Sequence, residues 1–190
     1  MSNINKFFYL LKWGLLIYVM YGVMKVNLDR PFWLDEVYSV ITSSFSTPIE
    51  LIKNYFLGLD QNPPLYFIVL NLLLKIFGEN VIAMKMMSFI FVMIGFYFLL
   101  KIEYLKNGDK HLLTALFFFL SPYISFYLLR EVRPYSLQFC LASIGMYIYS
   151  KPEQSLTKAL KIAAINTLLL YVHYYSIFYV GTLTAIDLYL

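Results

Sequence analysis

Two clusters of charged residues are the parts of this sequence best suited to chemistry. The first, in "RPFWLDEVYS", holds Arg30 and the adjacent carboxylates Asp35 and Glu36, and the second, in "LLREVRPYS", holds Glu131 and Arg133. A carboxylate can take a proton from an attacking hydroxyl or amine, and arginine presents fixed, planar donors that suit a phosphate oxygen. Together, the two clusters are suited to transferring a group from a lipid-linked phosphate.

Two other interpretations fit the same residues. Asp35 and Glu36 could bind a proton or a cation in a transporter, or they could be loop charges that pair with Arg130 or Arg133 and hold the helices together. Ionisable groups near hydrocarbon usually face a protein interior, a cavity or each other, whichever role they serve. Spacing in the sequence therefore leaves the three interpretations open.

The composition of the chain is that of a membrane protein. Of its 190 residues, 61% are hydrophobic and 14% are charged, whereas soluble domains have roughly 45–50% apolar and about 25% charged residues. The lysines behind the net charge of +4 lie at the edges of apolar runs, so the charge does not indicate a nucleic-acid binder. The single cysteine, Cys140, excludes an intramolecular disulfide, and we expect it to be a small buried hydrophobic residue.

Apolar runs predict an all-α fold, a polytopic bundle of transmembrane helices. They are Phe7–Val26, Leu65–Phe77, Val81–Leu100, Leu112–Leu129, Tyr135–Tyr149 and Ile162–Leu190. The first run is near the ~20 residues that cross a bilayer, and no small-residue cleavage site follows it, so we expect an uncleaved signal anchor. The last run is long for one helix and short for two full ones, which leaves a bent or re-entrant pair open.

The run Leu65–Phe77 decides the expected topology. It would form about 20 Å of helix, which is short for a hydrocarbon core of ~30 Å. If it lies on the outer surface as an interfacial helix, residues 27–80 form one external segment with juxtamembrane helices. The lysine-rich segments Lys101–His111 and Lys151–Lys161 then both face the cytoplasm, as the positive-inside rule requires. We therefore expect a multi-pass membrane protein, with both charged clusters on its extracytoplasmic side.

Three further features stand out among the polar and helix-breaking residues. The tandem prolines Pro63 and Pro64 in "QNPPLYFIVL" predict a helix start with a fixed entry angle. Pro122 in "SPYISFY" predicts a kink or break in its apolar run. His173 in "YVHYYS" could be a ligand, an acid/base group or a hydrogen-bonded intramembrane histidine. We predict the last, and no metal site, because no second histidine or cysteine-rich partner accompanies it.

Taken in order, four motifs resemble a known family. "WLDEVYS", "QNPPLYFIVLNLLLKIFGEN", "SPYISFYLLREVRPYSL" and "VHYYSIFY" are similar to the N-terminal part of the membrane glycosyltransferases of the GT-C fold. The branch they resemble is the dolichyl-phosphate-mannose-protein mannosyltransferase-like group, glycosyltransferase family 39. The resemblance covers almost the whole chain, and the ordered set of motifs is far more specific than any single one.

The resemblance implies roles for individual residues. Asp35 would be the catalytic carboxylate, with Glu36 beside it as a catalytic helper or a structural partner. Arg133 would lie near the lipid phosphate, and the Pro-Pro-Leu-Tyr segment would begin a juxtamembrane helix that lines the donor site. The residues expected to contact substrate are Arg133, Glu131, Tyr135, Pro64, Tyr66, Arg30 and His173.

The resemblance also implies a reaction. A sugar would pass, with inversion, from a polyprenyl-phosphate-linked donor to a protein, lipid or cell-surface glycan, with no cofactor. Two departures are clear: Asn62 stands where relatives often carry His or Lys, and relatives run to several hundred residues. We therefore expect residues 1–190 to be the N-terminal part of a GT-C domain, whose partners are the lipid-linked donor, membrane lipids and a further membrane subunit or C-terminal part. The alternatives are a transporter or flippase, and an inactive membrane scaffold.

Overall fold

The part of the chain that the structure describes is helical. The computed structural model describes residues 30–55, 62–107, 131–153 and 155–189, together with positions 14, 17, 18, 21, 22, 25, 128 and 129. In these residues the chain forms seven labelled helices and no strand. They are α2 (Leu34–Ser43), α3 (Pro48–Tyr55), α4 (Leu65–Phe77), α5 (Val81–Asn107), α7 (Tyr135–Tyr149), α8 (Leu156–Val172) and α9 (Ser176–Tyr189).

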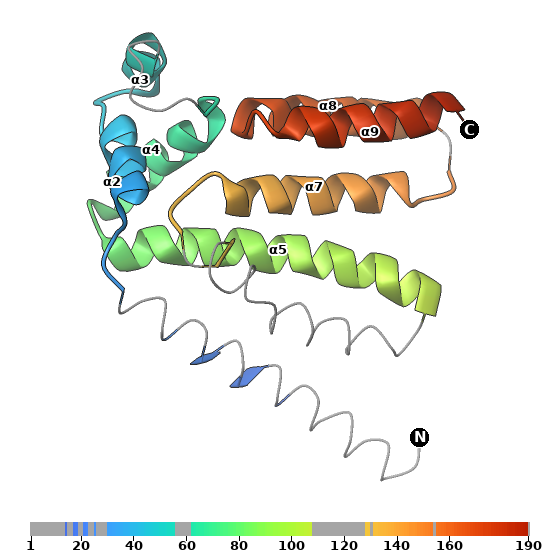
Figure 1. Cartoon of the computed structure of the whole chain (residues 1–190), viewed down its shortest axis with the longest axis horizontal. Helices are drawn as coiled ribbons and strands as arrows, with labels where there is room; N and C mark the ends of the chain where they lie inside the picture. Colours follow the sequence, from blue (N-terminus) through green and yellow to red (C-terminus); the bar gives the residue numbers. More distant parts are fainter. Residues whose placement is uncertain are drawn as a thin grey trace.

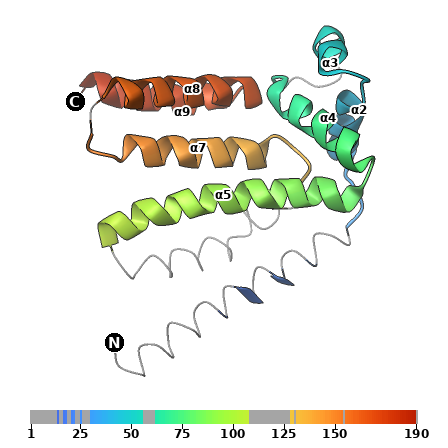
Figure 2. The same cartoon turned by 180° about the vertical axis from the view of Figure 1, so that it is seen from behind.

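The helices form two groups. α5, α7 and the pair α8 and α9 lie side by side along the long axis of the molecule, and the shorter α2, α3 and α4 lie across one end (Figures 1 and 2). The chain enters α7 and passes from α8 to α9 at this same end. Residues far apart in the sequence therefore meet where the short helices cover the bundle.

Several expected elements are confirmed. The expected helices over Leu65–Phe77 and Tyr135–Tyr149 are α4 and α7, with the same bounds, and Pro64 is the residue that precedes α4. α5 begins at Val81 as expected but continues to Asn107, so the lysine-rich segment after the apolar run is partly helical. The runs at 7–26 and 112–129, including Pro122, lie almost wholly outside the described residues.

The last apolar run forms two helices. α8 starts at Ser155, whose Oγ accepts a hydrogen bond from the Lys158 main-chain N–H at 3.2 Å. It ends at His173, whose extended backbone (φ −153°, ψ 134°) breaks the helical path before α9 starts at Ser176. The pair that the sequence left open is therefore two helices lying side by side (Figures 1 and 2).

One helix in the described part of the chain, over Val81–Ile102, is long and apolar enough to cross a membrane. α4 and the segment Ser176–Ala185 of α9 are apolar but shorter. The described residues confirm the all-α fold, whereas the polytopic bundle remains a prediction.

α5 and α7 approach closely at Gly95. A Cβ atom built on Gly95 would lie 2.8 Å from Cε1 of Phe139 and 3.0 Å from the Cα of Cys140, closer than carbon atoms pack. Cys140 is a free, buried thiol at this contact, as the sequence predicted. The absence of a side chain on Gly95 therefore sets the distance between the two helices.

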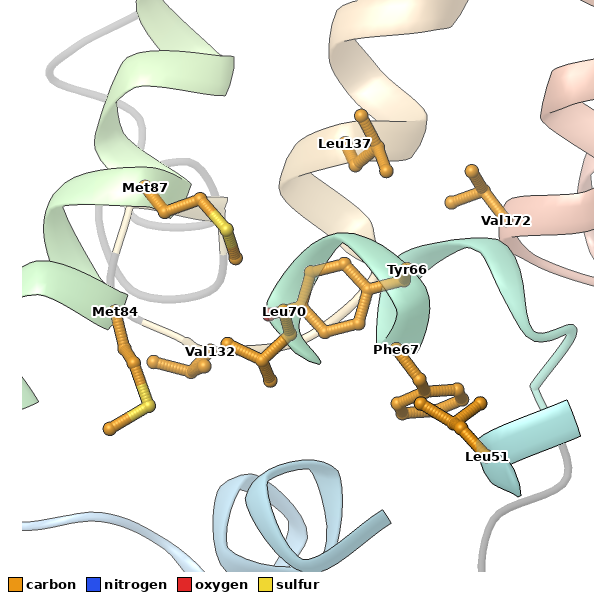
Figure 3. Close-up of a cluster of buried hydrophobic side chains, with 9 residues drawn as sticks. All are labelled: Leu51, Tyr66, Phe67, Leu70, Met84, Met87, Val132, Leu137 and Val172. Carbon is orange, nitrogen blue, oxygen red and sulfur yellow. The ribbon is translucent and has the colours of Figure 1, made fainter. Parts of the chain in front are cut away.

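A cluster of buried apolar side chains fixes the short helices to the bundle (Figure 3). Its members come from α3, α4, α5, α7, α8 and the segment before α7. They are Leu51, Tyr66, Phe67, Leu70, Met84, Met87, Val132, Leu137 and Val172. Asn71 of α4 adds polar contacts, because its Nδ2 donates to the main-chain oxygens of Ser43 and Phe45 at 2.8 and 2.7 Å. These contacts hold α4 against the C-terminal end of α2.

We expect Gly95→Ala to destabilise the protein by about 1–3 kcal/mol, the usual cost of overpacking a close contact. The matched control is Gly181→Ala in α9, where a new Cβ has no neighbour within 4 Å. Because alanine favours a helix over glycine by about 1 kcal/mol, the control should be neutral or stabilising. Thermal unfolding in detergent compares the two variants, and equal midpoints would contradict the close approach.

Candidate functional site

Glu36 lies at the centre of the charged residues and is fully buried in the first turn of α2. Its Oε2 accepts a hydrogen bond from Arg30 Nη2 at 2.7 Å, which is also an ion pair, and another from the Trp33 main-chain N–H at 2.7 Å. Its Oε1 accepts from the main-chain N–H of Val132 at 2.9 Å. One carboxylate therefore joins α2 to the segment before α2 and to the segment before α7.

The segment before α2 is held by two buried cations. The guanidinium of Arg30 lies 5.8 Å from the centre of the Trp33 ring, within cation–π range. Lys85 of α5 is buried too, and its Nζ donates to the main-chain oxygen of Arg30 and lies 5.9 Å from the centre of the Phe32 ring. Lys85 was not among the expected site residues. The available signal was a lone lysine inside the apolar run "VIAMKMMSF".

Arg133 contacts α2 at two of its residues. Its Nη1 donates to the main-chain oxygen of Asp35 at 3.1 Å and to Oγ of Ser39 at 3.2 Å. The expected pairing of Arg133 with Glu36 is therefore wrong, because the ion pair of Glu36 is with Arg30. Arg130 itself lies outside the described residues.

Asp35 lies in surroundings different from those of Glu36. Successive residues of a helix point about 100° apart, so the burial of Glu36 turns Asp35 outward. Asp35 is exposed, and no hydrogen bond to its carboxylate is found among the described residues. An exposed carboxylate can reach an external acceptor, whereas a fully buried one cannot. The geometry therefore favours Asp35 as the reacting group and Glu36 as the structural partner.

Glu131 adds a third carboxylate to the site. It is half-buried, and its main-chain oxygen accepts a hydrogen bond from Ser88 Oγ at 2.9 Å. Burial, and then the negative charge of Glu36, raise the pKa of Glu131 above its ordinary value, while Arg30 and Arg133 partly oppose the shift. Three carboxylates and two guanidiniums thus share one small region.

Tyr66 and Pro64 occupy different places. Tyr66 is fully buried in the cluster of Figure 3, beside Ser88, and burial raises its pKa far above the ordinary tyrosine value. In this structure the ring packs inside that cluster, and the expected contact of Tyr66 with substrate stays a prediction. Pro64 is half-buried and lines an open surface instead.

That surface is an apolar groove of about 530 Å³ between α4, α3 and α8. Its lining residues are almost all aliphatic, prolyl or aromatic. They are Ile52, Pro63, Pro64, Leu65, Ile68, Leu168, Leu170 and Tyr171. A groove of this size and lining suits an alkyl or isoprenoid chain.

His173 is buried at the turn between α8 and α9. Its Nδ1 accepts a hydrogen bond from the Tyr175 main-chain N–H at 3.1 Å, and its ring centre lies 5.3 Å from that of Tyr135. Among the described residues, no group of His, Cys, Asp and Glu side chains could hold a metal ion. His173 is thus a hydrogen-bonded, buried histidine, and Tyr135 at the start of α7 links it to the neighbourhood of Arg133.

We expect Glu36→Gln to destabilise the protein by about 3–5 kcal/mol, because it removes one charge of a buried ion pair with Arg30. Asp35→Asn is the matched control, since the neighbouring exposed carboxylate should contribute within about 0.5 kcal/mol. Thermal unfolding in detergent measures both. A Glu36→Gln variant as stable as the wild type would show that this carboxylate does not hold the segments together.

Glu131→Gln should change the pH dependence of stability. Because the folded protein raises the Glu131 pKa, the protonated form is favoured in the fold, and the charge becomes destabilising as the pH rises above the ordinary glutamate pKa of about 4.3. The variant should therefore unfold at a higher temperature than the wild type at about pH 7, and the difference should shrink toward about pH 4. A difference that is independent of pH would contradict the shift.

Comparison with known proteins gives no match for this chain. No family model, no curated protein and no solved structure matches it. What the site does must therefore follow from its own chemistry and from the motifs described above.

Proposed function

We propose that this chain belongs to a membrane glycosyltransferase that takes its sugar from a polyprenyl-phosphate-linked donor on the extracytoplasmic face. The observation that carries the proposal is that a carboxylate and a guanidinium meet at one residue. The Asp35 carboxylate is exposed, and the Arg133 guanidinium donates a hydrogen bond to the main-chain oxygen of Asp35 at 3.1 Å. The ordered resemblance of four motifs to the GT-C glycosyltransferases supports it.

The proposed reaction uses the two groups in complementary ways. Asp35 takes the proton of an acceptor hydroxyl while the acceptor oxygen forms a bond to the anomeric carbon of the sugar. The bond between that carbon and the phosphate oxygen breaks, and polyprenyl phosphate leaves with the electron pair. Arg133 stabilises the charge that develops on the phosphate. Attack opposite the leaving group inverts the anomeric configuration.

The surroundings support a lipid-linked donor. The apolar groove of about 530 Å³ that Pro64 lines could hold isoprenoid units, whose only favourable contacts are apolar. Glu36 contributes by position: its three hydrogen bonds fix the first turn of α2, so the backbone that carries Asp35 is held rigid. Glu131 lies close enough to Arg30 and Arg133 to interact electrostatically with both guanidiniums.

The test is the loss of transfer in Asp35→Asn. In membranes from cells that express the protein, release of polyprenyl phosphate from radiolabelled polyprenyl-phosphate-linked hexoses should fall at least about 100-fold, the usual contribution of a general base. The matched control is Glu79→Gln, an exposed carboxylate between α4 and α5, which should leave release unchanged. Near-normal release in Asp35→Asn would refute the assignment, and transport of the donor without cleavage would favour the transporter interpretation.

A further inference from the structure

An exposed pair of aromatic rings lies at the turn between α8 and α9. The side chains of Tyr174 and Tyr175 are 48% and 56% exposed, and their ring centres are 4.3 Å apart with the planes tilted by 51°. Both rings therefore contact each other and still present a large part of their surface outside the protein. We call these two residues the tyrosine pair.

The tyrosine pair is held in place by a buried residue. The imidazole of His173 stacks on Tyr174 with a centre-to-centre distance of 4.7 Å and an interplanar angle of 24°, and on Tyr175 with 5.2 Å and 28°. The same imidazole accepts the Tyr175 main-chain N–H at 3.1 Å. Because packing and hydrogen bonding already fix these rings, a ligand that stacks on them pays little conformational entropy.

The tyrosine pair is continuous with the candidate site. The ring of Tyr135, two residues after Arg133, lies 5.3 Å from His173, centre to centre. Gln138 of α7 also donates to Oγ of Ser176 at 3.1 Å, which ties the start of α9 to the first turn of α7. A molecule that rests on the tyrosine pair is therefore near Arg133, whose charge acts on Tyr174.

The chemistry of the tyrosine pair selects its ligand. A tyrosine ring offers an electron-rich face and a hydroxyl at its edge. A pyranose ring matches both, since one of its faces is lined with weakly positive C–H groups and its rim carries hydroxyls. Aromatic residues also collect at membrane interfaces, but that role does not require a buried histidine to order them.

We propose that Tyr174 and Tyr175 form a carbohydrate-binding platform for the acceptor, so that the acceptor is a glycan or a glycolipid rather than a bare protein side chain. The use of the bound sugar as acceptor rests on the proposed transferase function, whereas its binding does not. The platform would orient one pyranose ring so that a free hydroxyl of the same glycan reaches Asp35.

Saturation-transfer difference NMR on the purified chain in detergent micelles tests the platform. The probes are mannohexaose, maltohexaose and chitohexaose, each in millimolar excess. We expect saturation of ring C–H protons in at least one of them, and at least a fivefold loss of this signal in the double variant Tyr174→Ala/Tyr175→Ala. Tyr175→Phe should keep most of the signal, because the ring face remains. The matched control is Tyr97→Ala, a tyrosine of α5 that is 52% exposed and pairs with Lys101 instead.

The possible results separate the two proposals. Saturation that Asp35→Asn retains, while sugar transfer is absent from the wild type, would leave the platform standing and refute the transferase. No saturation with any of the three probes, or an unchanged signal in the alanine double variant, would overturn the platform. If the double variant is unfolded by thermal melting, the two single alanine variants decide: each must lower the signal for the platform to stand, and retention of the full signal in both overturns it.

Discussion

A fully buried carboxylate must be surrounded by donors, and Glu36 meets this requirement by joining three parts of the chain. Its two oxygens accept from the Arg30 guanidinium and from two main-chain N–H groups, one of which, Val132, is 96 positions away in the sequence. A buried ion pair contributes little net stability, because desolvation offsets the attraction. Its effect is to specify one arrangement, since any other would leave a charge buried and unpaired.

The arrangement of the site follows from that constraint. With Glu36 turned inward, the geometry of the helix turns the adjacent Asp35 outward, where a substrate can reach it. The hydrogen bond from Val132 also brings the next residue, Arg133, against α2, where it contacts the Asp35 main-chain oxygen. The buried Glu36 thus fixes the first turn of α2, and this turn positions the exposed Asp35.

Two surfaces of different chemistry border this site. The groove that Pro64 lines is apolar, whereas Tyr174 and Tyr175 present exposed aromatic rings. Both surfaces include residues at or near the C-terminal end of α8, because the chain reverses there at His173. The reaction proposed above, between a lipid-linked donor and a glycan acceptor, would use one surface of each kind.

The sequence by itself determined the helical class, the bounds of α4 and α7, the start of α5 and the two charged clusters, because these depend on local signals such as apolar runs and prolines. It did not determine that the last run forms two helices, since length alone permits either form. Only the tertiary structure decided that Glu36 pairs with Arg30 rather than with a later arginine, and that the lone Lys85 of an apolar run is bonded to the Arg30 backbone. The ion pair joins residues only six positions apart, but it forms because Glu36 is on the buried side of α2. The contacts that Lys85 and Val132 make with this segment join residues 55 and 96 positions apart, and no local pattern encodes them.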